Sequence, residues 1–225
     1  MIGLIGGMSW ESTVEYYRIM NEMVKEKLGG WNSAEVLLYS VNFEEIVSLQ
    51  KAGEWDRLGE ILGDIAVKLE NAGAKAVLIC TNTMHKVADA VEKRIGIPLI
   101  NIIDVTAEAL KGDGVKKAGL LGTKFTMEDG FYQERMKKHG IEVIVPEKEE
   151  DRNAIHSIIF DELCLGIIRE ESERRLRKIV DELKERGAEG IILGCTELPL
   201  ILRDEEFYNT TKLHAEAAVQ LLLEG

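Results

Sequence analysis

The sequence predicts an α/β protein built from two pseudo-symmetric domains, each with a parallel sheet, that face each other across an interdomain cleft. Short apolar runs alternate with amphipathic stretches along all 225 residues, which is the pattern of repeated strand–helix units. Most of these runs are continuously apolar, as expected for parallel strands that are covered on both faces. In addition, two segments recur in the same order at nearly the same spacing, which indicates an internal duplication.

Seven apolar runs are predicted to be strands: Ile2–Ile5, Glu35–Val41, Ala76–Cys80, Leu99–Ile103, Ala118–Leu121, Glu142–Val145 and Gly190–Gly194. Between them, apolar residues recur with the 3.6-residue period of a helix. One such stripe consists of Leu58, Ile61, Leu62, Ile65 and Leu69, and another of Leu176, Ile179, Val180 and Leu183. The second stripe lies in Glu170–Arg186, whose many charged residues are expected to form a solvated helix face.

The repeat consists of two pairs of matching segments. Gly3–Gly6 recurs as Gly119–Gly122, 116 residues later, and Gly73–Thr81 recurs as Gly187–Cys195, 114 residues later. A helix–Gly–Ala–strand connection is common enough in α/β proteins to recur by chance. The shared order and the nearly equal offset nevertheless favour two similar halves.

The two halves are assigned to residues 1–105 and 106–205. Residues 206–225 are assigned to a further helix, recognised over Lys212–Leu223, which is expected to pack back on the first domain and complete it. Ligands of parallel sheets gather beyond the carboxyl ends of the strands. Two facing halves would therefore present two equivalent strand ends, Thr81 and Cys195, to one cleft.

Composition and charge exclude several classes of partner. Forty acidic residues outnumber 28 basic ones, and the net charge of -12 repels phosphate backbones and anionic lipids, so neither nucleic acid nor a membrane is an expected partner. Apolar runs stay well short of the roughly 18 residues that span a membrane, and no secretory signal is recognised. The three cysteines, Cys80, Cys164 and Cys195, lack the spacing of a disulfide framework. A cytoplasmic protein with reduced thiols is therefore expected.

Small polar residues follow two of the predicted strands, in Cys80–Thr83 and Gly194–Glu197. Each segment precedes a predicted helix, where open backbone N–H groups can bind a carboxylate and where the helix N-terminus lowers the pKa of a cysteine. Cys195 is therefore the candidate acid–base or nucleophilic thiol. Asn82 or Thr83 could instead simply cap the helix that carries His85.

The remaining cysteines and histidines carry less information. Cys80 would point to the other side of its strand from Thr81 and is interpreted as structural. Cys164 lies at a predicted helix end, and a position lining the cleft and one away from it are equally expected. The histidines and cysteines lack the spacing of a metal site, so no metal is expected. The opening segment Gly3–Ser9 lacks the GxGxxG spacing of a dinucleotide site, and it is interpreted as containing a glycine turn that lets the backbone approach a small ligand.

Several motifs together resemble the aspartate/glutamate racemase family, and within it the branch of L-aspartate/glutamate-specific and broad-specificity amino-acid racemases. The longest are Gly6-Gly7-Met8-Ser9-Trp10-Glu11-Ser12-Thr13, Cys80-Thr81-Asn82-Thr83-Met84-His85-Lys86 and Gly194-Cys195-Thr196-Glu197-Leu198-Pro199, supported by Gly53-Glu54-Trp55-Asp56 and Leu121-Gly122-Thr123. The resemblance implies two α/β domains with the active site between them, no pyridoxal phosphate or other cofactor, an amino acid as substrate, and a homodimer.

The resemblance also implies a two-base mechanism, in which one group removes the α-proton and another returns a proton to the opposite face. Most members use a cysteine from each half. Here the match assigns these roles to Cys195 and Thr81, and the related branch resembles this chain in carrying threonine. A hydroxyl has a pKa of ~15, against ~8.5 for a thiol, so Thr81 is better suited to donate a proton than to remove one. Cys80 or a water could stand in for Thr81, and Glu197 could activate Cys195 or serve only as a cap or ion pair.

The substrate-binding residues are predicted by the same motifs. The expected set is Met8, Gln50, Asn82, Thr83, Thr123, Cys164, Thr196 and Glu197. Typical aspartate racemases resemble one another in gripping the side-chain carboxylate with an arginine and a lysine, where this chain has Gln50 and Cys164. This difference favours a broader polar range of substrates over aspartate alone. Lys124 is the nearest cation by position in the motif.

Two other functions remain open at this point. A decarboxylase of the same fold would need only the one thiol, Cys195, to protonate an enolate. A non-catalytic amino-acid binding protein would also use a cleft between two lobes. Carbon dioxide release from a malonate-type acid would identify the first, and binding without α-proton exchange would identify the second.

Overall fold

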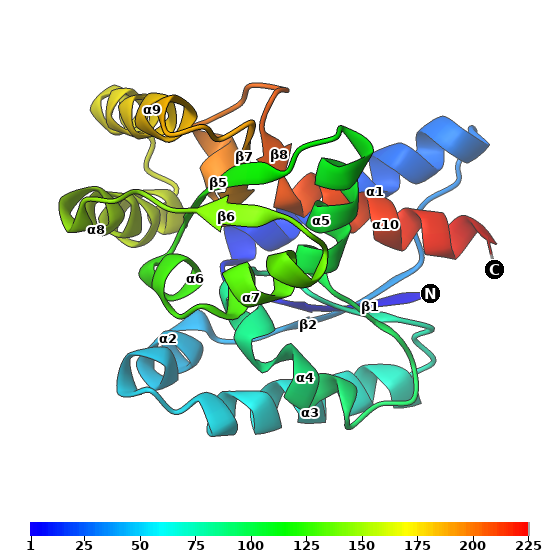
Figure 1. The fold of residues 1–225 in the computed structure, drawn as a ribbon. Coiled ribbons are helices and arrows are strands. Elements are labelled where there is room, and N and C mark those ends of the chain that lie inside the picture. The colour runs from blue at the N-terminus through cyan, green and yellow to red at the C-terminus, as the bar shows by residue number, and fades with distance from the viewer. Residues whose placement is uncertain (225) are drawn as a thin grey trace. The chain divides into compact units, whose positions relative to one another are not determined.

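Four parallel strands form the sheet of the first unit, which comprises Met1–Ile102 and the segment from Thr211 onward. The computed structural model describes residues 1–224, and Figure 1 shows the chain as a ribbon. The strands lie in the order β2-β1-β3-β4. Their bounds are β1 Ile2–Gly6, β2 Val36–Ser40, β3 Val77–Ile79 and β4 Leu99–Ile100.

Helices cover both faces of this sheet. On one face, side chains of α2 (Phe43–Ala52) and α3 (Trp55–Asn71) pack against β1 and β3. On the other, α1 (Trp10–Leu28) and the C-terminal α10 (Thr210–Glu224) pack against the same strands. A short 3₁₀ helix (Thr83–Val87) and α4 (Ala88–Glu92) follow β3. Burial on both faces explains why these strands are continuously apolar.

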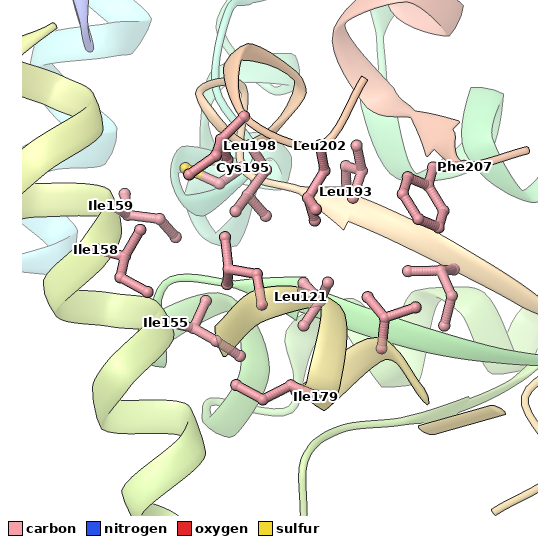
Figure 2. Close-up of a cluster of buried hydrophobic side chains, with 14 of the residues drawn as sticks. Leu121, Ile155, Ile158, Ile159, Ile179, Leu193, Cys195, Leu198, Leu202 and Phe207 are labelled. Carbon is pink, nitrogen blue, oxygen red and sulfur yellow. The ribbon is translucent and has the colours of Figure 1, made fainter. Parts of the chain in front are cut away.

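The second unit, Ile103–Thr210, contains a second parallel sheet in the order β6-β5-β7-β8. Its strands are β5 Lys117–Gly122, β6 Glu142–Ile144, β7 Gly190–Gly194 and β8 Tyr208–Asn209. Its helices are α5 Ile102–Gly112, which begins at the unit boundary, α6 Lys124–Glu128, α7 Phe131–Lys138, α8 Glu149–Ser157 and α9 Glu170–Glu185. Figure 2 shows the apolar cluster in which residues of α8 and α9 meet β5 and β7.

The two sheets have the same strand order, as the internal repeat predicts. Gly3 pairs with Val77 in the first sheet, and the equivalent Gly119 pairs with Ile191 in the second. A Cβ on Gly3 would lie 3.1 Å from the Cβ of Leu69, and one on Gly119 would lie 3.2 Å from the Cβ of Leu183. Both glycines therefore let a helix approach the sheet closely.

Three details differ from the sequence-based expectation. The predicted strand Leu99–Ile103 ends at Ile100, because Ile102 and Ile103 begin α5 and lie on its apolar side. Residues 206–209 are not helical, since Tyr208–Asn209 form β8, and Gly225 lies outside the described residues. The helix expected over Glu170–Arg186 is present as α9. Arg175 bonds to the buried Asp151 of α8, so this helix face is not only solvated.

Within residues 1–224, no helix is both long and apolar enough to cross a membrane.

Candidate active site

In the second unit, three consecutive polar residues follow β7. The Cys195 thiol donates a hydrogen bond to Oε2 of Glu197 across 2.9 Å, and the Thr196 hydroxyl donates to the same oxygen across 3.0 Å. All three side chains are buried, with 7%, 3% and 2% of their surface exposed. A 3₁₀ turn, Leu198–Leu200, closes the segment through a bond from the Leu198 N–H to the Cys195 carbonyl.

The pKa of Cys195 is raised well above its ordinary value, first by burial and then by the negative charge of Glu197. The expectation that a helix N-terminus lowers this pKa is therefore wrong. The segment that follows Cys195 is a three-residue 3₁₀ turn, which has too few aligned peptides to provide a strong dipole. The resting group is a neutral thiol that is hydrogen-bonded to a carboxylate.

Two other predicted residues of this unit lie near the same strand ends. Cys164, in the 3₁₀ turn Leu163–Leu165, packs against the apolar cluster that contains Cys195 and contributes to its raised pKa. Figure 2 shows Cys195 within that cluster, beside Leu198. Thr123 follows β5, the sheet neighbour of β7, and its hydroxyl caps α6 by accepting a bond from the Thr126 N–H. Lys124 forms a weak ion pair with the exposed Glu149, with 3.8 Å between Nζ and Oε1.

In the first unit, Thr81 and Asn82 lie between the end of β3 and the 3₁₀ helix Thr83–Val87. The Thr81 N–H donates to the Ile79 carbonyl across 2.8 Å, and the Thr81 carbonyl lies 2.8 Å from Nδ1 of His85. Asn82 occupies the N-cap position without making a side-chain capping bond. The purely capping interpretation of Asn82 is therefore not supported.

Met8 and Gln50 belong to the same unit. Met8 follows β1, the sheet neighbour of β3, and is buried. The Gln50 side chain, only 4% exposed, donates from Nε2 to the sulfur of Met84 across 3.1 Å. Sulfur is a weak acceptor, so this amide can turn toward a polar ligand at little cost.

The glycine turn after β1 is required by the protein's own packing. Gly7 has φ +86°, and a Cβ there would lie 2.5 Å from the Val41 carbonyl oxygen. The Gly7 N–H donates to the Thr13 hydroxyl, which in turn donates to the Ser9 carbonyl, each across 2.8 Å.

Cys80 has no exposed surface and lies in the apolar cluster formed with α1 and α10. Burial raises its pKa. This position fits the structural interpretation of Cys80, because an unpaired thiolate is strongly disfavoured among apolar side chains.

A buried histidine cluster in the first unit was not anticipated. Besides its contact with Thr81, His85 packs edge-to-face against His214, with ring centroids 5.7 Å apart, and His214 bonds to Tyr16. In the sequence, the histidines stand out only as possible metal ligands, and their spacing does not fit a metal site. Over residues 1–224 no group of three or more His, Cys, Asp or Glu side chains is arranged to hold a metal ion. Nothing in the local sequence indicates that His85 bonds to the backbone of Thr81.

Comparison with known proteins places the chain in a family. The family model described as Asp/Glu/Hydantoin racemase matches residues 5–218. The chain belongs to the Asp/Glu/hydantoin racemase family. Its members named as racemases are isomerases, and this chain is accordingly a racemase.

Individual relatives agree with this placement. A proposed Asp/Glu racemase from Yersinia pestis is 49% identical over 99% of this chain and 98% of its own, with a TM-score of 0.90. An aspartate racemase homologue from Pyrococcus horikoshii OT3 is 36% identical over 98% and 97% of the two chains, with a TM-score of 0.83. The broad specificity amino-acid racemase RacX of Bacillus subtilis (strain 168) is 24% identical over 90% of this chain and 87% of its own.

Proposed function

We propose that this racemase interconverts L- and D-amino acids without a cofactor, with Cys195 removing the α-proton and Thr81 supplying a proton to the opposite face. The observation that carries the proposal is the 2.9 Å bond from the Cys195 thiol to Glu197 at the end of β7. Thr81 follows the equivalent strand of the other sheet, β3. The mechanism requires that the substrate Cα reaches both groups.

The first proton transfer needs a thiolate. Because the pKa of Cys195 is raised, the resting thiol must lose its proton when substrate binds. Glu197 is placed to accept that proton, and the substrate ammonium group would stabilise the thiolate that results. The thiolate then takes the α-proton, and the electron pair of the C–H bond delocalises into the substrate carboxylate.

The second transfer returns a proton to the other face. The Thr81 hydroxyl donates its proton to the carbanion, which is far more basic than an alkoxide, and then regains a proton from water. Glu197 gives the proton that it took from Cys195 to the resulting hydroxide, so the resting state is restored. Removing a proton with Thr81 is harder, because its hydroxyl has a pKa of ~15. Turnover from the enantiomer facing Thr81 should therefore be slower, with kcat and KM changing together because the equilibrium stays racemic.

Burial argues against Cys80 as a substitute for Thr81. Its side chain has no exposed surface, and its pKa is raised by burial alone. We therefore assign the proton donor to Thr81.

The proposed substrates are amino acids with polar side chains, including aspartate and glutamate but not restricted to them. The names of the relatives cover both aspartate racemase and broad specificity amino-acid racemase. Gln50 and Cys164 carry no charge to pair with a side-chain carboxylate. Met8, Asn82, Thr83, Thr123, Thr196 and Glu197 complete the proposed set of contacts.

We also propose that the enzyme acts in the cytoplasm as a homodimer. The three free cysteines support the cytoplasmic location. The family resemblance supports the homodimer. Light scattering after size-exclusion chromatography would test the oligomeric state.

The test is to incubate each enantiomer of a panel of amino acids with the enzyme and to follow its mirror image by chiral chromatography. Aspartate, glutamate and homoserine come first. Cys195→Ala should abolish conversion, whereas Cys80→Ala should retain it. If no amino acid is converted but a malonate-type acid releases carbon dioxide, the one-thiol decarboxylase replaces the racemase proposal. Binding of an amino acid without conversion would instead identify a binding protein.

A further inference from the structure

His85 lies four residues after Thr81, in the 3₁₀ helix Thr83–Val87, and both of its ring nitrogens bond to the backbone. Nδ1 lies 2.8 Å from the Thr81 carbonyl oxygen, and Nε2 lies 3.1 Å from the backbone nitrogen of Ile102, the first residue of α5. The ring is 5% exposed. A core histidine of this kind joins the end of β3 to the segment that follows β4.

The two partners fix the protonation of the ring. The Ile102 N–H can only donate, so Nε2 accepts and carries no hydrogen. The Thr81 carbonyl can only accept, so Nδ1 carries the hydrogen and donates it. His85 is therefore held as one neutral tautomer.

These bonds determine the direction of the Thr81 backbone. Thr81 follows the last residue of β3 by two positions, and its N–H is bound to Ile79 instead of a neighbouring strand. Its carbonyl is held by His85. Because a β-branched side chain has few χ1 states, the backbone direction largely sets where the Thr81 hydroxyl points.

A second histidine, His214, packs edge-to-face against the ring of His85. His214 donates from Nε2 to the Ile100 carbonyl across 2.7 Å and lies 2.9 Å, through Nδ1, from the Tyr16 hydroxyl. Burial, followed by the nearby His85, lowers the pKa of His214 to about 3, so this ring is also neutral. Tyr16 thus belongs to the same cluster and offers a matched control.

We propose that His85 is a positioning residue that aims the Thr81 hydroxyl at the substrate and so sets how efficiently a proton reaches the face opposite Cys195. The inference rests on the proposed racemase function. A carbanion that waits for a misplaced Thr81 would more often take a proton back from Cys195. Loss of the His85 bond should therefore favour return over inversion.

Two substitutions separate the two bonds of His85. In His85→Asn the amide nitrogen can take the place of Nδ1 and donate to Thr81, while the bond to Ile102 is lost. In His85→Gln the amide oxygen can take the place of Nε2 and accept from Ile102, while the Thr81 carbonyl loses its donor. Tyr16→Phe removes a bond in the same cluster and leaves both of these intact.

The readout is the ratio of inverted to retained deuterated product. One pure enantiomer is incubated in D2O, quenched early and separated by chirality, and the deuterium in each fraction is measured by mass spectrometry. A loss of folded enzyme lowers both products equally, so it does not change the ratio. If His85→Gln cannot be purified folded, His85→Ala replaces it, because it also leaves the Thr81 carbonyl without its donor.

We expect His85→Gln to lower the ratio about tenfold or more, and His85→Asn and Tyr16→Phe to stay within about threefold of the wild type. An equal fall in His85→Gln and Tyr16→Phe, or no fall in His85→Gln, would overturn the inference while leaving the racemase function intact. A wild-type enzyme that incorporates no deuterium would overturn the proposed function, and this inference with it.

Discussion

The Cys195 thiol and the Glu197 carboxylate form a buried hydrogen bond of 2.9 Å, with the Thr196 hydroxyl bound to the same carboxylate oxygen. The bond has two opposing consequences. The charge of Glu197 raises the pKa of Cys195, which disfavours thiolate at rest, yet the carboxylate is also the acceptor that can take the thiol proton. Substitutions at Glu197 distinguish these effects.

Glu197→Gln should lower the pKa of Cys195, because the neighbouring negative charge disappears. It should nevertheless slow racemisation by about 100-fold or more, since an amide cannot accept the thiol proton. Glu197→Asp keeps the carboxylate at a shorter reach and should lose less activity. The pKa is followed by the Cys195 13Cβ shift and the rate by chiral chromatography. A Gln variant that gains activity as its thiol pKa falls would show that Glu197 only restrains Cys195.

Stability should fall at alkaline pH because the pKa of Cys80 is raised in the folded protein. The unfolded chain loses the thiol proton above pH ~8.5 while the native chain keeps it, so the unfolded state binds fewer protons and the free energy of unfolding decreases as pH rises. Each such thiol contributes a slope of up to ~1.4 kcal/mol per pH unit. Cys80→Ala should reduce this slope in urea titrations between pH 8 and 10. Val91→Ala, another buried apolar truncation in the same unit, should lower stability without altering the slope, and equal slopes in both variants would contradict the expectation.

Gln50→Arg should shift substrate preference toward acidic amino acids. A guanidinium at this buried position, next to Met84, can form the bidentate bond to a side-chain carboxylate that Gln50 cannot. The ratio of kcat/KM for aspartate to that for homoserine should rise roughly tenfold or more. Gln50→Met provides the uncharged control of similar length. If the arginine variant folds and its ratio matches that of the methionine variant, Gln50 does not contact the substrate side chain.

Gly7→Ala should destabilise the protein more than Gly53→Ala. Both glycines have positive φ, +86° and +75°, so either alanine costs roughly 1–2 kcal/mol of backbone strain. Only at Gly7 would the added Cβ also meet backbone, 2.5 Å from the Val41 carbonyl, whereas nothing lies within 4 Å at Gly53. Urea denaturation of the two variants measures the difference directly. Equal losses would show that the turn after β1 can relax away from Val41.

Much of the fold could be predicted because its signals are local or repeated. Strands buried on both faces are continuously apolar, and the recurrence of Gly3–Gly6 as Gly119–Gly122 predicts two sheets with one strand order. The predicted end of the strand at Ile103 was wrong, because the apolar run from Leu99 to Ile103 suits either a strand or a helix. The strand β8 was missed because two residues leave no periodicity to detect.

The site could be predicted only in part. Cys195 and Glu197 are two residues apart, so their proximity was foreseeable, and the structure adds the bond between them. The direction of the pKa shift of Cys195 was not foreseeable, because it depends on burial and on the length of the turn that follows. The bond from His85 to Thr81 also escaped prediction, since a histidine in a helical turn gives no sign of its acceptor.

The most direct test of the account follows the α-proton of a substrate by proton NMR in D2O with the wild type, Cys195→Ala and Thr81→Ala. The account predicts that the wild-type enzyme exchanges the α-proton of both enantiomers and that Cys195→Ala exchanges neither appreciably. Thr81→Ala should still exchange the enantiomer facing Cys195, with retention of configuration, but should produce little of its mirror image. Undiminished racemisation by Cys195→Ala, or by Thr81→Ala, would contradict the assignment of the two groups.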